Sequence, residues 1–253
     1  MSISDEEYRK FATLTFDDFR KRAQDDSLSK YEKIGMPDSY RHGKEEIIFQ
    51  NIVANLPLLN DHEKVVLDVG PGCSDLPLMM VQLCRERGHT LLLVDSEEML
   101  AHLPDDGFIR KYPAYYPQCD SLFSEFTSKV DVLLAYSVLP MVFMEGNVWD
   151  FLDRSLELLA EGGEMLIGDI PNISKRRRFF SGANGIKFHQ EFMKTQTAPE
   201  VRFNTIERHR IDDSVILALL GRARNQGFDA YVLPQDPELS MANRREDILI
   251  RRP

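Results

Sequence analysis

From Lys64 to the C-terminus, short apolar runs alternate with segments that have helical periodicity. The apolar runs, each long enough for a buried strand, fall at 65–70, 90–95, 129–139 and 164–170. The helical patterns between them lie at 75–88, 96–103 and 146–163. Strands that are apolar on both faces and separated by helices are typical of a parallel sheet covered on both sides. The pattern therefore predicts a doubly wound, mostly parallel α/β sheet.

The C-terminal part departs from this alternation. A helix is predicted at 212–227, and two strands follow at 228–233 and 246–252 with no helical pattern between them. Parallel neighbours need a long crossover, usually a helix, so we expect these two strands to pair antiparallel. A weaker strand is predicted at 108–113.

Residues 1–60 precede the alternating pattern and are predicted to form an N-terminal helical cap, with 61–253 as one compact main domain. Aromatic residues recur at about helical spacing in the first part of this cap, at Tyr8, Phe11, Phe16 and Phe19. Two interpretations of the cap stay open at this point. Its helices either pack on the main domain only or form a lid over a site.

Composition excludes several classes of partner and location. The net charge is -10, whereas nucleic-acid binding depends on Lys and Arg, so no nucleic-acid partner is expected. Cys73, Cys84 and Cys119 lack metal-ligand or CxxC spacing, which favours reduced thiols in a cytoplasmic protein. The start is acidic and polar, unlike a secretory signal. The most apolar window, 132–144, is too short to span a bilayer, so no membrane insertion is expected. The oligomeric state is left open.

The stretch VVLDVGPGCSDLP, residues 65–77, joins the first predicted strand to the first predicted helix. Asp68 ends the apolar run, and Gly70, Pro71 and Gly72 follow. In a doubly wound sheet, ligands bind beyond the carboxyl ends of the strands. Glycines allow a tight turn and a close approach of backbone to ligand. This turn is therefore the predicted ligand site.

The residues around the turn favour a cofactor without phosphate. A dinucleotide site holds a pyrophosphate on the helix N-terminus, where this chain has Asp75, a carboxylate that would repel phosphates. Asp75 suits the helix dipole, and Ser74 is a predicted N-cap. Asp95 ends the second strand, where an acid accepts hydrogen bonds from ribose hydroxyls. Ribose without pyrophosphate suggests S-adenosylmethionine, and Asp68 faces the same crevice to hold its amino group.

These segments resemble the class I S-adenosylmethionine-dependent methyltransferases over about residues 62–253. LDVGPGCSD is similar to the first motif of that family, with Ser74 in place of the third glycine, and LLLVD to the second, whose acid binds the ribose. The segment LAEGGEMLIGDIP, 159–171, is similar to the turn and strand that follow in the family. The resemblance implies a seven-stranded sheet with an antiparallel last strand and S-adenosylmethionine as cofactor.

The resemblance also implies further cofactor contacts. QCDSL is similar to the third motif, which would bring Asp120, with Ser121 beside it, to the adenine amino group. The end of the fourth strand, with Tyr136, would lie under the methionine part. Ser96, the predicted N-cap after Asp95, is included among the cofactor contacts. In PDSYRHG, Arg41 would reach the carboxylate of the cofactor, and Tyr40 is placed on the acceptor side.

The segment 170–211 is irregular in pattern and carries the candidates for acceptor binding. Its basic cluster suggests that Arg177 and Arg178 bind a phosphate on the acceptor, the alternative being a solvated basic face. His189 is the candidate general base, the alternative being a structural histidine. Asp169 and Asn172 follow the fifth strand, where some relatives bind magnesium. Strand four ends in Tyr136 and Ser137 rather than an acid, so no metal is predicted.

The predicted function is S-adenosylmethionine-dependent methyl transfer to a small-molecule or sugar-like acceptor, preferably at oxygen. The stretch 34–49 resembles methyltransferases of bacterial surface-polysaccharide loci, which implies a nucleotide-linked sugar or surface-glycan precursor. Two alternatives stay open. One is an NAD(P)-dependent oxidoreductase, disfavoured by Asp75. The other is a non-catalytic cofactor-binding or scaffold protein that keeps the methyltransferase fold.

Overall fold

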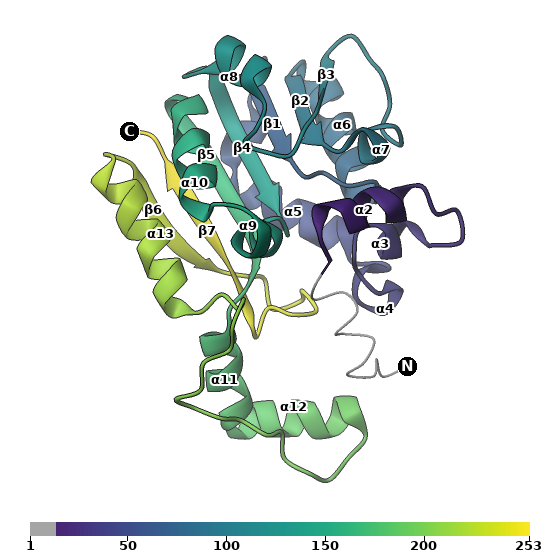
Figure 1. Cartoon of the computed structure of the whole chain (residues 1–253), viewed down its shortest axis with the longest axis vertical. Helices are drawn as coiled ribbons and strands as arrows, with labels where there is room; N and C mark the ends of the chain where they lie inside the picture. The colour runs from purple at the N-terminus through teal and green to yellow at the C-terminus, as the bar shows by residue number, and fades with distance from the viewer. Residues whose placement is uncertain (1–13) are drawn as a thin grey trace.

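The computed structural model describes residues 14–253, and a seven-stranded sheet of order β3-β2-β1-β4-β5-β7-β6 forms the centre of this part of the chain (Figure 1). Its strands are β1 (Val65–Val69), β2 (Thr90–Asp95), β3 (Ile109–Pro113), β4 (Val130–Tyr136), β5 (Leu159–Pro171), β6 (Asp229–Pro234) and β7 (Arg245–Arg251). In this sheet β7 runs opposite to the other strands, because its pairings with β5 and β6 are antiparallel and the remaining pairings are parallel. The predicted fold class and the antiparallel C-terminal pair are confirmed.

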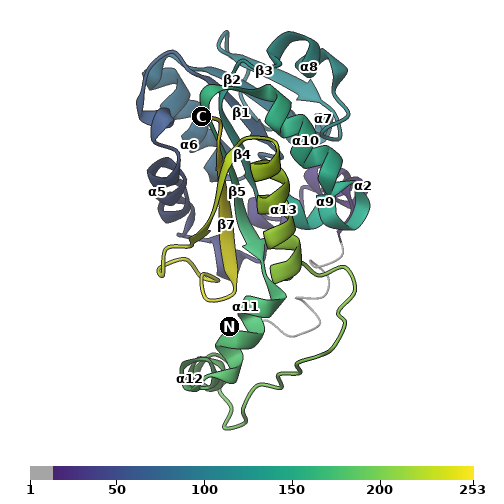
Figure 2. The ribbon, with the colours of Figure 1, turned by 90° about the vertical axis from the view of Figure 1, so that its left-hand side faces the viewer.

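Helices cover both faces of the sheet, as Figure 2 shows, with α5 and α6 on one side and α10 and α13 on the other. The helices packed around the sheet are α5 (Glu45–Asn55), η1 (Pro57–Asn60), α6 (Asp75–Arg87), α7 (Glu97–Leu100), α8 (Asp120–Phe126), α9 (Leu139–Glu145), α10 (Val148–Leu158) and α13 (Asp213–Asn225). The helix predicted at 146–163 ends earlier, at Leu158, and β5 begins at the next residue.

Each face of the sheet has its own hydrophobic core. On one face, Ile52 of α5 and Met80 of α6 belong to the same buried cluster as Leu93 of β2. On the other face, Phe151 of α10 and Leu133 of β4 are fully buried in a second cluster. Each such side chain contributes on the order of 1.5–3 kcal/mol on burial. The strands are therefore held firmly, and so are the turns at their carboxyl ends.

From residue 14 onward, three short helices precede α5: α2 (Phe16–Ala23), α3 (Lys30–Lys33) and α4 (Asp38–Arg41). Arg20 of α2 pairs with Glu98 of α7 at 2.8 Å, which ties this segment to the main sheet. Of the aromatic residues that predicted the first cap helix, Tyr8 and Phe11 lie outside the described residues. The α5 helix contributes to the sheet's core, and a division of the chain at residue 60 stays a prediction.

The region between β5 and α13 differs most from the sequence prediction, because it contains two helices where an irregular segment was expected. They are α11 (Ile173–Ser181) and α12 (Ala183–Met193), and they project away from the sheet (Figures 1 and 2). Asn172 begins α11, since its side chain accepts hydrogen bonds from the N–H groups of Ser174 and Lys175. Within residues 14–253, no helix is long and apolar enough to cross a membrane.

Candidate functional site

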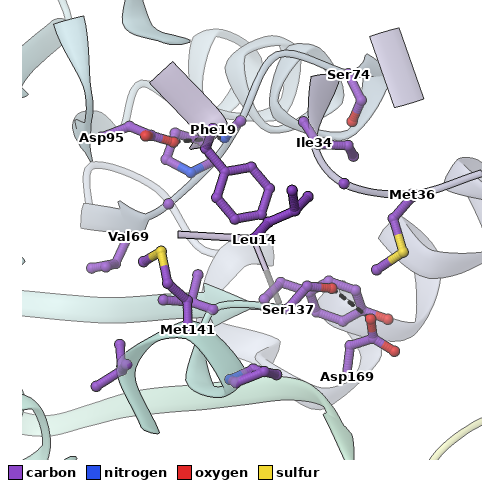
Figure 3. Close-up of a pocket in the computed structure, with 18 of the residues that line it drawn as sticks. Leu14, Phe19, Ile34, Met36, Val69, Ser74, Asp95, Ser137, Met141 and Asp169 are labelled. Carbon is purple, nitrogen blue, oxygen red and sulfur yellow. Dashed lines mark hydrogen bonds between the residues drawn. The ribbon is translucent and has the colours of Figure 1, made fainter. Parts of the chain in front are cut away.

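A cavity of about 240 Å³ lies at the carboxyl ends of β1, β2, β4 and β5. Its wall comes from the turn after β1, from α9, from the N-terminal segment and from loops that precede α13 and β7. Figure 3 shows Leu14 and Phe19 in the middle of this space, between Asp95 on one side and Ser137 with Asp169 on the other. The cavity thus lies where a doubly wound sheet binds its ligands.

The turn after β1 requires glycine at two positions. Gly70 and Gly72 both have φ +67°, which disfavours other residues. A Cβ at Gly70 would lie 2.6 Å from Val138 Cγ2, and one at Gly72 would lie 2.6 Å from Ile34 Cγ2. Pro71, between them, also lines the cavity. The predicted role of these glycines, a tight turn with close approach, therefore has a direct packing reason.

Asp95 at the end of β2 holds this turn in place. Its Oδ2 accepts a hydrogen bond from the Gly72 N–H at 3.0 Å, and its Oδ1 accepts one from the Ser96 N–H at 2.6 Å. Burial raises the pKa of Asp95 to about 6, although these two backbone donors oppose the shift. Carboxylate oxygens have further lone pairs, so Asp95 can still accept from a ligand in the cavity.

Ser96 caps α7, as predicted, since its Oγ accepts from the Met99 N–H at 3.2 Å. Ser96 is not part of the cavity wall, whereas Met99 is. Its effect on the site is therefore to fix the chain next to Asp95.

Asp68 at the end of β1 lines the cavity and is 5% exposed. Burial, helped by the negative charge of Asp95, raises the pKa of Asp68 to about 7. No hydrogen bond from residues 14–253 offsets this rise. A cationic group of a ligand beside this buried carboxyl group would stabilise its ionised form.

The N-terminus of α6 is occupied by a carboxylate of the chain itself. Glu45 Oε2 accepts hydrogen bonds from the N–H groups of Asp75 at 2.7 Å and Leu76 at 3.1 Å. The predicted side-chain cap by Ser74 is wrong, because Ser74 stands at the N-cap position without a capping bond. Packing of α5 against α6 delivers Glu45 to these donors instead. Asp75 forms an ion pair with Lys30.

Arg41, the last residue of α4, is a buried cation on the cavity wall. Its Nε lies 3.8 Å from Glu45 Oε1, and its guanidinium lies 5.6 Å from the centre of the Tyr136 ring. Neither Arg41 Nε nor Glu45 Oε1 has a hydrogen-bond partner among the described residues. Tyr40 and Tyr136 line the same wall. Arg41 therefore offers a donor to a ligand in the cavity.

A second polar group lies where β4 and β5 end. Ser137 and Asp169 both have positive φ, 64° and 61°, which is uncommon for residues other than glycine and is found at functional sites. The Ser137 hydroxyl donates to Asp169 Oδ2, and Arg245 forms an ion pair with the same carboxylate. Burial alone would raise the pKa of Asp169, but the charges of Arg245 and Arg41 and the bond from Ser137 lower it overall. Asp169 is therefore an ionised carboxylate facing the cavity.

Besides Ser96, two residues predicted to contact the cofactor are not on the cavity wall. Asp120 and Ser121 are exposed at the start of α8. Ala114 and Tyr116, which follow β3, line the cavity in their place. The Tyr116 hydroxyl is within hydrogen-bonding distance of Ser155 Oγ, at 2.9 Å, in the core.

The three acceptor-side candidates on α11 and α12 also lie off the cavity. Arg177 pairs with Glu207 at 2.7 Å, and Arg178 pairs with Asp213. His189 lies against the Phe180 ring, with 6.4 Å between ring centres. None of these three belongs to the cavity wall, because α11 and α12 carry them away from the strand ends. The structure thus separates them from the predicted cofactor residues.

Sequence reasoning missed several residues of this site. The role of Glu45 was not foreseen, and neither was the pairing of Asp169 with Arg245. Each depends on contact between segments far apart in the chain, 30 positions for Glu45 and Asp75 and 76 for Asp169 and Arg245. The only local signal was the position of Asp169 near the end of an apolar strand. Among residues 14–253, no group of three His, Cys, Asp or Glu side chains is arranged to hold a metal.

Solved structures with the same fold are S-adenosylmethionine-dependent methyltransferases. Phosphoethanolamine N-methyltransferase 2 of Haemonchus contortus, in complex with S-adenosyl-L-methionine, is 16% identical with a TM-score of 0.55 over 94% of this chain, which spans 59% of that protein. Geranyl diphosphate C-methyltransferase of Streptomyces coelicolor A3(2), in complex with Mg²⁺, geranyl diphosphate and S-adenosyl-L-homocysteine, is 11% identical with a TM-score of 0.53 over 100% of both chains.

A methyltransferase of Aquifex aeolicus is 11% identical, with a TM-score of 0.52 over 89% of this chain and 100% of that one. No family model matches the sequence, and no curated protein matches it. At these identities the likeness concerns the fold. The chain has the Rossmann-like fold of the S-adenosylmethionine-dependent methyltransferases.

Proposed function

We propose that this protein transfers a methyl group from S-adenosylmethionine to a small-molecule acceptor. One observation carries the proposal. Asp68 and Asp95 end two neighbouring strands of this fold, and both line one cavity together with Gly70 and Gly72. This is the combination expected for a cofactor with a ribose and a cationic amino group but no pyrophosphate.

The residues of the cavity fit such a cofactor. Asp95 would accept hydrogen bonds from the ribose hydroxyls, and Asp68, which lacks a donor of its own, would hold the ammonium group. Arg41, whose buried Nε has no partner among the described residues, would donate to the carboxylate. Ala114 and Tyr116 would lie beside the adenine of the cofactor, in the position that the sequence assigned to Asp120. Tyr136 would lie beside the methionine part.

The dinucleotide alternative is disfavoured by Glu45. In a dinucleotide site the helix N-terminus donates to a pyrophosphate. Here the N–H groups of Asp75 and Leu76 already donate to the Glu45 carboxylate. A phosphate would have to displace a buried anion, and Asp75 would repel it as well. An NAD(P)-dependent oxidoreductase is therefore the weaker proposal.

For catalysis, the chain must align an acceptor atom with the reactive methyl group, because S-adenosylmethionine itself supplies an electrophilic methyl on a sulfonium. Asp169 is the best candidate to orient an acceptor hydroxyl, since it is ionised and faces the cavity beside Ser137. It replaces His189 in this role. Methylation at oxygen, and a nucleotide-linked sugar or surface-glycan precursor as acceptor, are carried over from the sequence as proposals.

The segment 14–41 would act as a lid over the bound cofactor. Leu14, Phe19 and Ile34 line the cavity, with Ile34 packed directly on Gly72 of the turn after β1, and Phe16 packs edge-on against Tyr115 at 5.0 Å between ring centres. Apolar side chains in this place exclude water from the reacting groups. This supports the lid interpretation of the N-terminal helices over simple packing.

Parallel calorimetric titrations with S-adenosylhomocysteine, NAD and NADP test the proposal. We expect micromolar binding of S-adenosylhomocysteine alone, and loss of this binding in Asp95→Ala but not in the exposed-site control Asp105→Ala. Tight binding of a dinucleotide, or no binding of S-adenosylhomocysteine, would overturn the assignment. Binding without turnover across a broad acceptor panel would favour the non-catalytic alternative.

A further inference from the structure

The end of the cavity beside β5 carries more positive than negative charge. Three arginines line the cavity, Arg41, Arg210 and Arg245, and Asp169 is the acidic residue beside them. The protein as a whole has a net charge of -10, so this local excess runs against the rest of the molecule. An excess of arginine at a ligand cavity favours an anionic ligand group.

Two of the three arginines have carboxylate partners within the chain. Arg245 forms an ion pair with Asp169, and Arg41 lies 3.8 Å from Glu45. Arg210 is the exception. Among residues 14–253, its side chain forms no hydrogen bond or ion pair, although it belongs to the cavity wall. Of the three arginines, it is therefore the one with no protein carboxylate beside it among the described residues.

Arg210 is exposed, but the chain next to it is held in place. Ile211 is 3% exposed, and its carbonyl accepts a hydrogen bond from the Ile173 N–H at 2.9 Å, just beyond the end of β5. Asp212 then caps α13 by accepting from the N–H groups of Ser214 and Val215. The backbone at Arg210 is thus fixed beside the strand end that carries Asp169.

Resting on the proposed methyl transfer, we infer that the acceptor carries an anionic group, a carboxylate or a phosphate, and that Arg210 binds this group at the β5 end of the cavity. The acceptor body would then lie along the apolar wall formed by Pro140, Met141 and Met144 of α9. This arrangement places the rest of the acceptor between Asp169 and the cofactor residues. A phosphate on a nucleotide-linked sugar is one form of such a group.

The basic cluster on α11 is a weaker candidate for the same task. Arg177 donates to Thr205 and Glu207, and Arg178 donates to Asp213. An anion at either residue would compete with a carboxylate that is already bound. Neither residue lines the main cavity. We therefore assign the anion contact to Arg210 rather than to Arg177 and Arg178.

Matched probes test the inference by binding, with the protein first saturated with S-adenosylhomocysteine. The probes are 4-hydroxyphenylacetate, 4-hydroxyphenyl phosphate and the uncharged 4-hydroxyphenylacetamide. We expect at least one anion to bind about tenfold more tightly than the amide, as a charge-assisted contact implies. The anion that binds more tightly identifies the group as carboxylate or phosphate.

Two variants assign the preference to one residue. Arg210→Gln should abolish the preference for the anion and leave S-adenosylhomocysteine binding unchanged. Arg208→Gln, an exposed residue of the same loop that does not line the cavity, should keep the preference. The inference is overturned if Arg210→Gln keeps the preference, or if the wild-type protein binds no anion better than the amide. Failure of S-adenosylhomocysteine to bind at all would instead overturn the proposed function.

Discussion

The Glu45 carboxylate accepts a hydrogen bond from the Asp75 N–H at 2.7 Å, so a side chain of the protein supplies the anion that binds the N-terminus of α6. Glu45 is 3% exposed, and its second oxygen faces Arg41 at 3.8 Å. The residue thus links the helix that follows the glycine turn to the N-terminal segment that covers the cavity. The same carboxylate occupies the helix N-terminus that a pyrophosphate would need, and it lies beside Arg41.

Replacing Glu45 by Gln should lower the free energy of unfolding by about 1–3 kcal/mol, since a buried charge-assisted hydrogen bond and the partner of Arg41 are lost. Urea unfolding measures the change. Glu46→Gln is the matched control, because Glu46 is the exposed neighbour on the same helix, and its effect should stay within about 0.5 kcal/mol. Equal stabilities of the two variants would show that the Glu45 contact is unimportant.

Alanine at Gly70 or Gly72 should weaken S-adenosylhomocysteine binding by at least about tenfold, because the new Cβ would lie 2.6 Å from Val138 or Ile34 in a turn with positive φ. Calorimetry gives the affinities. Gly221→Ala provides the control, since nothing lies within 4 Å of its Cβ position in α13. That variant should bind normally and gain up to about 1 kcal/mol of stability. Normal binding by Gly70→Ala would contradict the proposed turn.

Stability of the unliganded protein should depend on Asp68 in a defined pH window. Its pKa is raised from 3.8 to about 7, so the folded state keeps a proton that the unfolded state releases. Stability from this group is therefore present at low pH and falls as pH rises from about 4 to about 7. Asp68→Asn removes this loss, and the variant should be more stable than wild type at pH 8 by on the order of 2 kcal/mol.

Urea unfolding of both proteins at pH 4 and pH 8 separates this effect from a general change in packing. The two proteins should differ little at pH 4 and most at pH 8. The same variant should bind S-adenosylmethionine at least about tenfold more weakly, because the ammonium group loses its partner. A variant that is less stable than wild type at pH 8 would show that the Asp68 charge is compensated in the folded protein.

Asp169, and not His189, should control turnover once an acceptor is found. Asp169→Asn is expected to lower kcat by about a hundredfold or more, since the charge that orients the acceptor is lost. His189→Ala should stay within about twofold, because the His189 ring packs against Phe180 away from the cavity. The measurement is initial-rate kinetics of S-adenosylhomocysteine release.

Asp169→Asn also leaves Arg245 facing a neutral side chain, so its fold must be checked by thermal unfolding and by S-adenosylhomocysteine binding. Ser137→Ala is a milder change in the same pair and should lower kcat by a smaller factor. A large loss of kcat in His189→Ala, with both Asp169→Asn and Ser137→Ala near wild type, would show that His189 is the general base, as the sequence predicted.

The sequence alone was sufficient to predict the sheet and its ligand edge. Strand and helix periodicities depend on residues within a few positions of each other, and burial on both faces leaves the strands uniformly apolar. Gly70 and Gly72 lie in a tight turn and Asp95 ends β2, as the sequence predicted, because glycine turns and strand ends are local features. The family resemblance added the number of strands, seven, and agreed with the antiparallel C-terminal pair, whereas the order of the strands came from the structure.

Only the tertiary structure decided which side chains share the cavity. The Asp169 and Arg245 pair joins positions 76 apart, and such contacts leave no periodic signal in the sequence. The reverse holds for Asp120, His189 and Arg177, which follow strands of the site in sequence but lie outside the cavity wall, on α8, α12 and α11. Local chemistry selects candidate residues, whereas the packing of distant segments determines which of them face the same space.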